Sequence, residues 1–594
     1  MNGIREELEK GYQALFTRFH LDPPLDANNI GLIIRQSLKA FLEHAKRPAV
    51  YCYGGHTKML MADYMHELKN VKYIVDNYAA PEGEHLGFRL IKDEEMEASG
   101  IDAVVLSSYK FRKDLKQKLK ESHPKMPVLD IYDEFEKKGI RVQADYYYSN
   151  HPYQHYKRIN QLQREIRDCD RESVLKDLYK DLITKYIHIK DFRTAIGKLE
   201  EWKGHRAFHP EHGDQTEELL AAVKDLYALQ KKAAAALSEN HVLLFCLDGL
   251  RRQDLSERTM PKLKRLLDET GYQFTNAYSF STSTFESLVP AYSENGDLRT
   301  GYYEKNSVSE EECRFASFAE KQGRGFYIYG DGEHYIEGAH IHYRDQFSTV
   351  TEKLWQFLLD ASETERDLFY LHEIYESHFT FSNPYTETAL ISEGTAMLFD
   401  FLPVKGGRLR ADYARQHEDA IRYMDDVVEP ILRPMRCRMV LYADHGNLIL
   451  DYNTSLSEIG SMEYTCSEGW TGIPLAIRSR EMGTGKDNRL ISLLEFNPIV
   501  ISLLSGTPYQ APDCDYIKMA RSELYNPDFR LLYRMIGKER YLQAFECFLF
   551  AEGRKLMVYA DGTTQLYQAD DTEIFDTEAE GALLENVKKD ITVY

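Results

Sequence analysis

MVLYADHGN, residues 439–447, is the stretch that says most about the fold and the chemistry of this chain. Its first residues form an apolar run that predicts a buried strand, and Asp444 and His445 come where that strand ends. Gly446 then allows the chain to turn. Loops at strand ends carry the chemistry of open α/β sheets, and an Asp oxygen beside an imidazole nitrogen suits Zn²⁺ or Mn²⁺. A turn without a metal is the alternative for this stretch taken alone.

A second strand-like run, HVLLFCLDGLRRQDL at 241–255, ends in Asp248 and is followed by a Gly turn and a helical pattern. Asp248 is therefore also predicted at the carboxyl end of a strand. Further along, the hydroxyl cluster STST at 281–284 precedes a helical-looking ESLVPAYS. A nucleophilic hydroxyl there would meet a helix N-terminus, where backbone N–H groups favour an anion. Ser and Thr are also ordinary N-caps, which is the alternative for this cluster.

The composition limits the classes of protein to which the chain can belong. Its 594 residues suggest three or four domains. The net charge is −21, from 74 Lys and Arg against 95 Asp and Glu, and no basic block stands out, so a nucleic-acid partner is not expected. No apolar run approaches the length of a membrane span, and the eight Cys show no CxxC spacing. We therefore predict a cytoplasmic protein with reduced thiols and no transmembrane segment.

Residues 46–145 have the pattern of a small Rossmann-like domain, after an N-terminal helical segment at 1–45. Four strand-like runs alternate with helical patterns, at 49–54, 71–76, 101–108 and 126–133. Gly54 and Gly55 follow the first run, and Asp76 ends the second, where a dinucleotide fold places the acid that binds a ribose. No GxGxxG is present, so a nucleotide or nucleotide-sugar pocket and a docking or assembly module both stay open.

Residues 146–240 are rich in charge and carry Leu and Ile at helical spacing, which predicts amphipathic helices. We interpret this region as a helical connector. Apolar helix faces pack on neighbouring helices or on a second subunit, so a homodimer is compatible with the sequence.

Successive segments between about 242 and 506 resemble signatures of the alkaline phosphatase and sulfatase superfamily. They are LFCLDGLR, STSTFESLVP, FYLHEIYESHF (369–379), YARQHEDAIRYMDDVVEPIL (413–432), LYADHGN and EGWTGIPLAIRS (468–479). The tail at 548–576 resembles the C-terminal hairpin of that superfamily. The resemblance implies an α/β fold, with an alkaline-phosphatase-like mixed sheet sandwiched by helices at 241–510. A C-terminal subdomain with an antiparallel hairpin is then expected at 511–594.

By position, the resemblance makes Asp248, Asp444 and His445 ligands of one divalent metal, with the oxygen of Thr284 completing its coordination. Thr284 is also the implied nucleophile. Zn²⁺ or Mn²⁺ is expected ahead of Ca²⁺ or Mg²⁺. A second metal is not expected, because HEIYESH at 372–378 lacks the Asp-x-x-x-His pair that holds the second zinc of alkaline phosphatases.

The register of the nucleophile has an alternative. Thr284 stands three residues before Ser287 and shortly before Pro290, which resembles the T-x-x-S-x-P pattern of phosphoethanolamine transferases with one extra residue before the Pro. Thr282 stands in a Thr-Ser-x-x-Glu pattern that resembles the lipoteichoic acid synthases, which are phosphoglycerol transferases. We prefer Thr284 and keep Thr282 open.

Three further residues are candidates for substrate binding. His378 resembles the transferase His that meets the substrate phosphate, and it could donate a proton to a phosphate oxygen or to the leaving group. His372 ends the same strand, where a role in the core is an equal alternative. Glu468 stands near the position at which alkaline phosphatases carry a further metal-binding His.

The expected function is a metal-dependent phosphotransferase or phosphodiesterase that acts through a phospho-threonine intermediate. A sulfatase-like hydrolase of sulfate esters is the alternative within the superfamily, but no C/S-x-P-x-R element for formylglycine occurs near 279–300. A non-catalytic assembly protein with a retained metal site is the alternative from another class. The expected substrate is a soluble or head-group phosphate ester, nucleotide- or sugar-linked. The donor, the acceptor, and the choice between hydrolase and transferase stay open.

Overall fold

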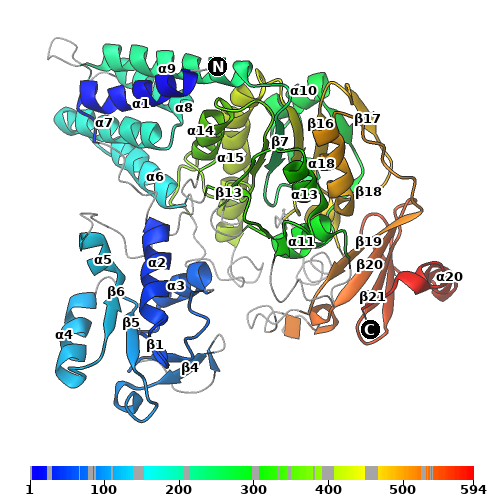
Figure 1. The fold of residues 1–594 in the computed structure, drawn as a ribbon, viewed down its shortest axis with the longest axis horizontal. Coiled ribbons are helices and arrows are strands. Elements are labelled where there is room, and N and C mark those ends of the chain that lie inside the picture. The colour runs from blue at the N-terminus through cyan, green and yellow to red at the C-terminus, as the bar shows by residue number, and fades with distance from the viewer. Residues whose placement is uncertain are drawn as a thin grey trace. The chain divides into compact units, whose positions relative to one another are not determined.

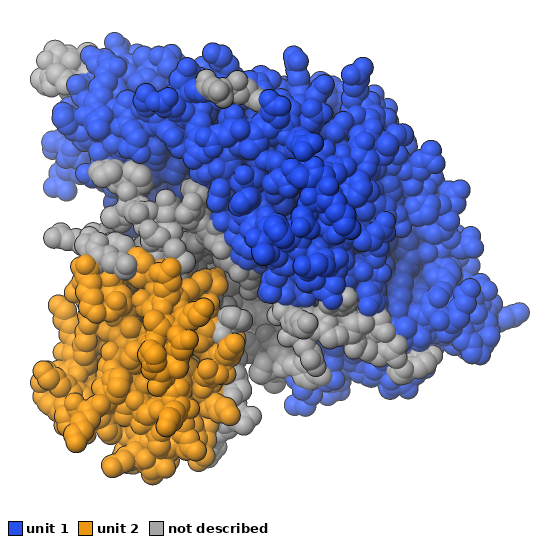
Figure 2. All heavy atoms as spheres, viewed as in Figure 1, with its two compact units in different colours: residues 1–22, 155–594 blue, residues 23–154 orange. Residues whose placement is uncertain are grey.

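The structure is a computed structural model. It describes residues 3–22, 30–65, 67–77, 84–85, 88–108, 111–137, 153–205, 208, 215–296, 307–330, 334–344, 349–378, 381–390, 407–447, 466–523, 530, 533–534, 537 and 539–593. The chain divides into two compact units (Figure 2). Unit 1 comprises Met1–Asp22 and His155–Tyr594, and unit 2 comprises Pro23–Gln154.

Unit 2 contains a six-stranded sheet in the order β3-β4-β2-β1-β5-β6. The strands are β1 (Pro48–Tyr51), β2 (Tyr73–Val75), β3 (Glu84–His85), β4 (Phe88–Ile91), β5 (Ala103–Leu106) and β6 (Val128–Asp130). Only β3 pairs antiparallel among these strands. Taken along the chain, the five parallel strands have the order 3-2-1-4-5, which is the order of a Rossmann-type sheet.

Helices cover both faces of the sheet in unit 2. They are α2 (Ile30–Leu42), α3 (Gly55–Tyr64), α4 (Arg112–Ser122) and α5 (Ile131–Lys137). Val50 and Val105 point into a core shared with α2, α3 and α5, whereas Ala49 and Val104 point into a core shared with α4. The central strands β1 and β5 are apolar and buried throughout because neither of their faces meets water.

Unit 1 is built on an eight-stranded sheet in the order β13-β11-β14-β7-β15-β16-β8-β17. The strands are β7 (Val242–Cys246), β8 (Tyr272–Phe274), β11 (Phe326–Tyr329), β13 (Ile341–Tyr343), β14 (Leu368–Leu371), β15 (Arg438–Tyr442), β16 (Leu475–Arg478) and β17 (Gly485–Asp487). β16 is antiparallel to both of its neighbours, and the other described pairs are parallel. The mixed α/β sheet that was expected is therefore confirmed.

Two groups of helices pack on this sheet (Figure 1). In one group α15 (Gly407–Leu432) contacts α10 (Pro261–Thr270) and α14 (Val350–Ala361). In the other, α18 (Phe496–Ser505) contacts α11 (Thr284–Ser293) and α13 (Arg314–Lys321). All of β7 is buried, as expected for a central strand covered on both faces.

The amphipathic helices expected before the sheet are present in unit 1. They are α6 (Tyr153–Arg167), α7 (Glu172–His188), α8 (Phe192–Lys203) and α9 (Thr216–Ala236). The N-terminal helix α1 (Ile4–Phe19) packs on α9, and α9 also contacts α14 and α15. Among the described residues, no helix combines the length and the apolar character that a membrane crossing requires.

The C-terminal part of unit 1 is a five-stranded antiparallel sheet (Figure 1). Its strands are β19 (Tyr516–Arg521), β20 (Phe545–Phe550), β21 (Lys555–Tyr559), β22 (Thr564–Tyr567) and β23 (Glu573–Ile574), and α20 (Thr577–Val587) packs on one face. Two short strand pairs complete unit 1: β9 (Ala277–Tyr278) with β18 (Ile491–Ser492), and β10 (Val308–Ser309) with β12 (Ile336–Glu337).

Candidate metal centre

Three neighbouring parallel strands bring the predicted site residues to one edge of the sheet. Asp248 follows β7, His378 follows β14, and Asp444 and His445 follow β15. β7 lies between β14 and β15, so the carboxyl ends of all three strands meet. One ligand atom from each of Asp248, His378 and His445 lies within 4.8 Å of the others. His378 is therefore a candidate ligand in addition to the residues that the sequence predicts here.

The ring of His445 is oriented by its own loop. Its Nδ1 lies 2.6 Å from the carbonyl oxygen of Gly446, which can only accept a hydrogen bond, so Nδ1 carries the proton. Nε2 therefore presents a lone pair to the cluster. It lies 3.4 Å from Asp444 Oδ2 and 3.8 Å from Asp248 Oδ1. A hydrogen bond from the far ring nitrogen to a backbone carbonyl is how metal-binding histidines are commonly held.

The two carboxyl groups of the site are buried beside the imidazole rings of His378 and His445. Asp248 is 3% exposed and Asp444 is fully buried. Asp444 Oδ1 accepts a hydrogen bond from the Gly249 N–H at 3.1 Å, but Asp444 Oδ2 has no hydrogen-bond partner among the described residues. A buried carboxylate oxygen in this state costs free energy, and a divalent cation would satisfy it. The donor set of carboxylate, imidazole and hydroxyl fits Zn²⁺ or Mn²⁺.

Thr284 is the first residue of α11, and its Oγ1 lies 3.2 Å from His445 Nε2. The chain enters this helix through Ser283, whose backbone is extended and whose side chain makes no capping hydrogen bond. Negative charge on or near Thr284 would lie at the positive end of the helix dipole. None of the hydrogen bonds described for this region joins the side chain of Thr282 to the cluster.

The hydroxyl cluster that precedes α11 is held by Glu286, a buried residue that the sequence analysis did not single out. Glu286 Oε2 accepts from Ser281 Oγ at 2.9 Å and from Ser283 Oγ at 3.3 Å. Its Oε1 accepts from the N–H and the hydroxyl of Ser522, which follows β19. The C-terminal sheet is thereby bonded to the loop that carries Thr284. In the sequence, only the position of Glu286 after a Ser/Thr run, at the start of a predicted helix, hinted that it accepts hydrogen bonds from these serines.

Replacing Glu286 by alanine is expected to slow turnover about tenfold or more and to lower the free energy of unfolding by about 2 kcal/mol, because the buried Ser281 and the partly buried Ser283 and Ser522 lose their acceptor. Urea unfolding and steady-state kinetics measure the two effects. Glu546 is a matched control: it is also buried in the C-terminal sheet and accepts from the Thr592 N–H at 2.8 Å. Glu546→Ala should lose stability without a specific loss of turnover. Equal turnover losses in the two variants would contradict this role of Glu286.

His378 is more accessible than Asp248, Asp444 and His445, with 28% of its side chain exposed and Nε2 3.9 Å from Asp248 Oδ1. The turn before it is held by fully buried groups. Glu376 Oε1 accepts from the Val350 N–H at 2.8 Å and from the Tyr156 hydroxyl of α6 at 2.7 Å. Burial raises the pKa of the Glu376 carboxyl above its ordinary value. Lys353 Nζ donates to the carbonyl of His372 at 2.8 Å.

The other two predicted substrate residues do not join this group. His372 is fully buried and stacks on Tyr370 with 5.0 Å between ring centroids. Burial holds the pKa of the His372 ring well below its ordinary value. Glu468 begins the short helix α17 (Glu468–Thr471) and forms an ion pair with Arg252. A substrate role for either residue stays a prediction.

The acid predicted to meet a ribose in unit 2 is bonded within the protein. Asp76 Oδ2 accepts from the Tyr53 N–H at 2.7 Å, in the loop after β1. In the first turn of α3, the His56 ring lies 3.0 Å from Ser107 Oγ and 2.7 Å from the Tyr132 hydroxyl. Burial lowers the pKa of His56 to about 3, so its ring is neutral near pH 7. The nucleotide pocket predicted here stays a prediction.

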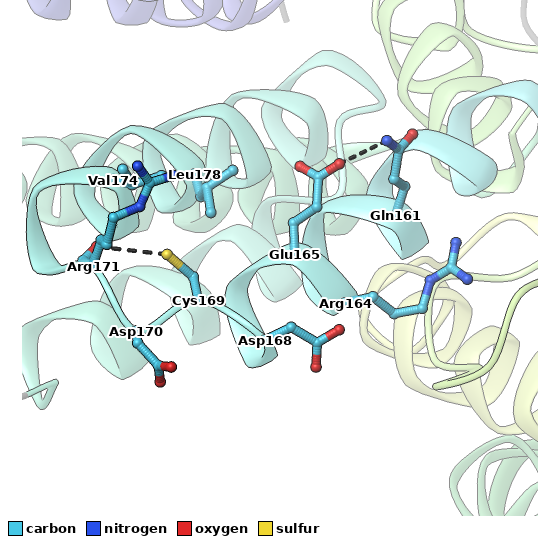
Figure 3. A pocket seen from close by; sticks show the side chains of 9 residues that line it. All are labelled: Gln161, Arg164, Glu165, Asp168, Cys169, Asp170, Arg171, Val174 and Leu178. Atoms are coloured by element: carbon cyan, nitrogen blue, oxygen red, sulfur yellow. Dashed lines mark hydrogen bonds between the residues drawn. The ribbon is translucent and has the colours of Figure 1, made fainter.

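Elsewhere in unit 1, a surface hollow lies between α6 and α7 (Figure 3). It is lined by Gln161, Arg164, Glu165, Asp168, Cys169, Asp170, Arg171, Val174 and Leu178. It shares no residue with the candidate metal centre, and both acidic and basic side chains line it.

Comparison with known proteins adds a likeness in fold. No protein-family model matches the chain, and no curated protein sequence does. Among solved structures, the chain is similar to a protein of the alkaline phosphatase superfamily from Vibrio parahaemolyticus (13% identity, TM-score 0.37, covering 60% of this chain and 88% of that one). It is also similar to phosphonate monoester hydrolase of Agrobacterium radiobacter (11% identity, TM-score 0.39, covering 60% and 95%).

A third similar structure is lipooligosaccharide phosphoethanolamine transferase A from Neisseria meningitidis, an integral membrane protein (15% identity, TM-score 0.32, covering 55% of this chain and 69% of that one). The three structures are thus named as a member of the alkaline phosphatase superfamily, a phosphonate monoester hydrolase and a phosphoethanolamine transferase. Because identity and TM-scores are low, the functional argument depends on the geometry of the metal centre.

Proposed function

We propose that this protein is a metal-dependent phosphotransferase or phosphodiesterase that acts through a phospho-threonine intermediate on Thr284. The observation that supports the proposal most strongly is the 3.2 Å approach of Thr284 Oγ1 to His445 Nε2, beside two buried carboxylates. A structural metal site has no need of a partly exposed hydroxyl at a helix N-terminus. A hydroxyl nucleophile needs an activating group and a favourable field for negative charge, and this edge of the sheet offers both.

Asp248, Asp444, His445 and Thr284 would hold one divalent cation, Zn²⁺ or Mn²⁺, with His378 beside them. When bound, such a cation lowers the pKa of a hydroxyl and neutralises charge on a phosphoryl oxygen. The protein has the remaining tasks of orienting the nucleophile, holding the ligands and meeting the substrate. Glu286 and the first turn of α11 orient Thr284.

In the first step, the Thr284 hydroxyl gives its proton to water, its Oγ1 forms a bond to phosphorus, and the ester O–P bond breaks on the opposite side. His378, accessible from solvent, can donate to a phosphate oxygen or to the leaving oxygen. In the second step, water or an acceptor alcohol loses its proton to solvent as its oxygen bonds to the phosphorus of the phospho-threonine. The Oγ1–P bond breaks, and the departing Thr284 oxygen takes up a proton again. The substrate we propose is a phosphate ester, nucleotide- or sugar-linked. A cytoplasmic location and a homodimer are further parts of the proposal.

The test is turnover of matched aryl phosphate monoesters, phosphodiesters and sulfate esters by metal-stripped protein, with Zn²⁺, Mn²⁺, Mg²⁺ or Ca²⁺ restored one at a time. Mono- or diester cleavage that returns with Zn²⁺ or Mn²⁺, together with phosphate on Thr284 in acid-quenched protein by mass spectrometry, is the expected result. Sulfate cleavage with Ca²⁺ would support the sulfatase alternative instead. Turnover without any modification of Thr284 would overturn the proposed intermediate.

A further inference from the structure

We infer that Asn447 is a positioning residue that joins the three loops of the metal centre through its side-chain amide. The inference rests on the proposed function, because it concerns the loops that would hold the cation. The sequence shows Asn447 only as the last residue of the opening motif. Its role depends on contacts with segments about 70 and 200 residues away.

The Asn447 amide lies between two backbone carbonyls. Its side chain is nearly buried, at 5% exposure, and its Nδ2 donates to the Gly249 carbonyl at 2.6 Å and to the Ser377 carbonyl at 3.3 Å. Gly249 follows Asp248, and Ser377 precedes His378. Both neighbours can only accept hydrogen bonds, so the NH₂ group must face them, and its two N–H bonds match the two carbonyls.

Gly249 completes the junction. Its φ is +68°, a conformation that favours glycine. A Cβ at this position would lie 2.3 Å from Asn447 Nδ2. The Gly249 N–H donates to Asp444 Oδ1 at 3.1 Å, while the Gly249 carbonyl accepts from Asn447. A single peptide segment is therefore held at both ends by the loop that carries Asp444 and His445.

This junction addresses a specific problem of the site. The buried carboxyl groups of Asp248 and Asp444 must lie close to His445 Nε2, at 3.8 Å and 3.4 Å, although they belong to separate loops. Strand pairing fixes the bases of the loops but not their tips, whereas ligand atoms need placement within about 0.5 Å. Asn447 crosslinks the tips without adding charge, so the ligand atoms of the three loops are held together before a cation arrives.

The experiment compares Zn²⁺ affinity by chelator competition in the full-length wild type, Asn447→Ala and Asn447→Leu. The leucine variant keeps the volume and removes the donor. Both variants should bind Zn²⁺ about 10- to 100-fold more weakly, with kcat lowered more than KM is raised.

Asn497 is a matched control: it is fully buried and its Nδ2 donates to the carbonyls of Ala291 (2.9 Å) and Tyr292 (2.6 Å). Asn497→Ala should lower the Tm of the metal-free protein as much as Asn447→Ala does, with Zn²⁺ affinity within about threefold of wild type.

Gly249→Ala gives a second, independent test. Its new Cβ enters the space of the Asn447 amide, so it should weaken Zn²⁺ binding as Asn447→Ala does. The double variant should lose less affinity than the two single losses combined, because the two lesions break the same junction. Wild-type affinity in Asn447→Ala, or an equal loss in Asn497→Ala, would overturn the inference alone. A wild type that binds neither Zn²⁺ nor Mn²⁺ would overturn the proposed function, and the inference with it.

Discussion

Thr284→Ala is expected to lower kcat/KM by about 10³-fold or more while the fold and much of the metal affinity are kept. The physical reason is that the variant lacks the oxygen that attacks phosphorus, and no other group replaces a removed nucleophile. Thr284 is only partly buried at the start of α11, so its removal should disturb packing little. Steady-state kinetics on the best ester of the substrate panel measures the effect, with circular dichroism and Zn²⁺ titration as checks of fold and binding.

Thr282→Ala is the matched control for this prediction, because it removes the same side chain two residues earlier in the same loop. It should keep turnover within a fewfold of the wild type. If Thr282→Ala loses turnover and Thr284→Ala keeps it, the nucleophile lies two residues away from the proposed position, in the register of the phosphoglycerol transferases.

Asp444→Asn should have the second large effect. It should weaken Zn²⁺ binding and turnover, but it should not lower the Tm of the metal-free protein. Loss of a ligand charge should weaken Zn²⁺ binding by about 10²-fold or more and lower turnover at least as much. The metal-free variant, however, should unfold at the same temperature as the metal-free wild type or at a higher one. Asp444 Oδ2 is buried without a donor among the described residues, so removing its charge removes a free-energy cost. Thermal unfolding with and without Zn²⁺ separates the two effects.

Asp425 is the control for this second prediction. It is 2% exposed, and its carboxylate accepts from the backbone N–H groups of Lys262 (3.1 Å) and Leu263 (2.7 Å), at the start of α10. Asp425→Asn should therefore lower Tm, because one of its oxygens becomes an amide that cannot accept, and it should keep Zn²⁺ affinity. A Tm loss in metal-free Asp444→Asn as large as that in Asp425→Asn would show that Asp444 is a structural residue.

The contrast between these residues shows what kind of information the sequence holds. Asp248 and Asp444 each follow a short apolar run and precede a Gly turn, and this local pattern predicts a carboxylate at a strand end. His372 also ends an apolar run, yet it is fully buried while His378 is accessible. Both histidines belong to one short segment, and no rule of residue spacing predicts that His372 is buried and that His378 lies at the edge of the sheet.

The residues that sequence analysis missed have partners in distant segments. Glu286 accepts from Ser522, which lies 236 residues further along the chain. Tyr156, in the helical connector, donates to Glu376, 220 residues away. Such pairs follow from the packing of elements whose order in the chain says little about their neighbours in space. Polar residues of this kind appear in the sequence as ordinary members of a helix or a turn.

The sequence by itself determined the apolar strands, the polar residues that end them and hence the mixed α/β class, because strand patterns and turn chemistry are encoded within a few residues. Only the tertiary structure decided that β14, β7 and β15 are neighbours. It also decided that Thr284 reaches His445 from the start of α11, and that Asn447 and Glu286 join loops from separate segments. Strand order and long-range hydrogen bonds depend on the free energy of packing the whole chain, which no local pattern contains.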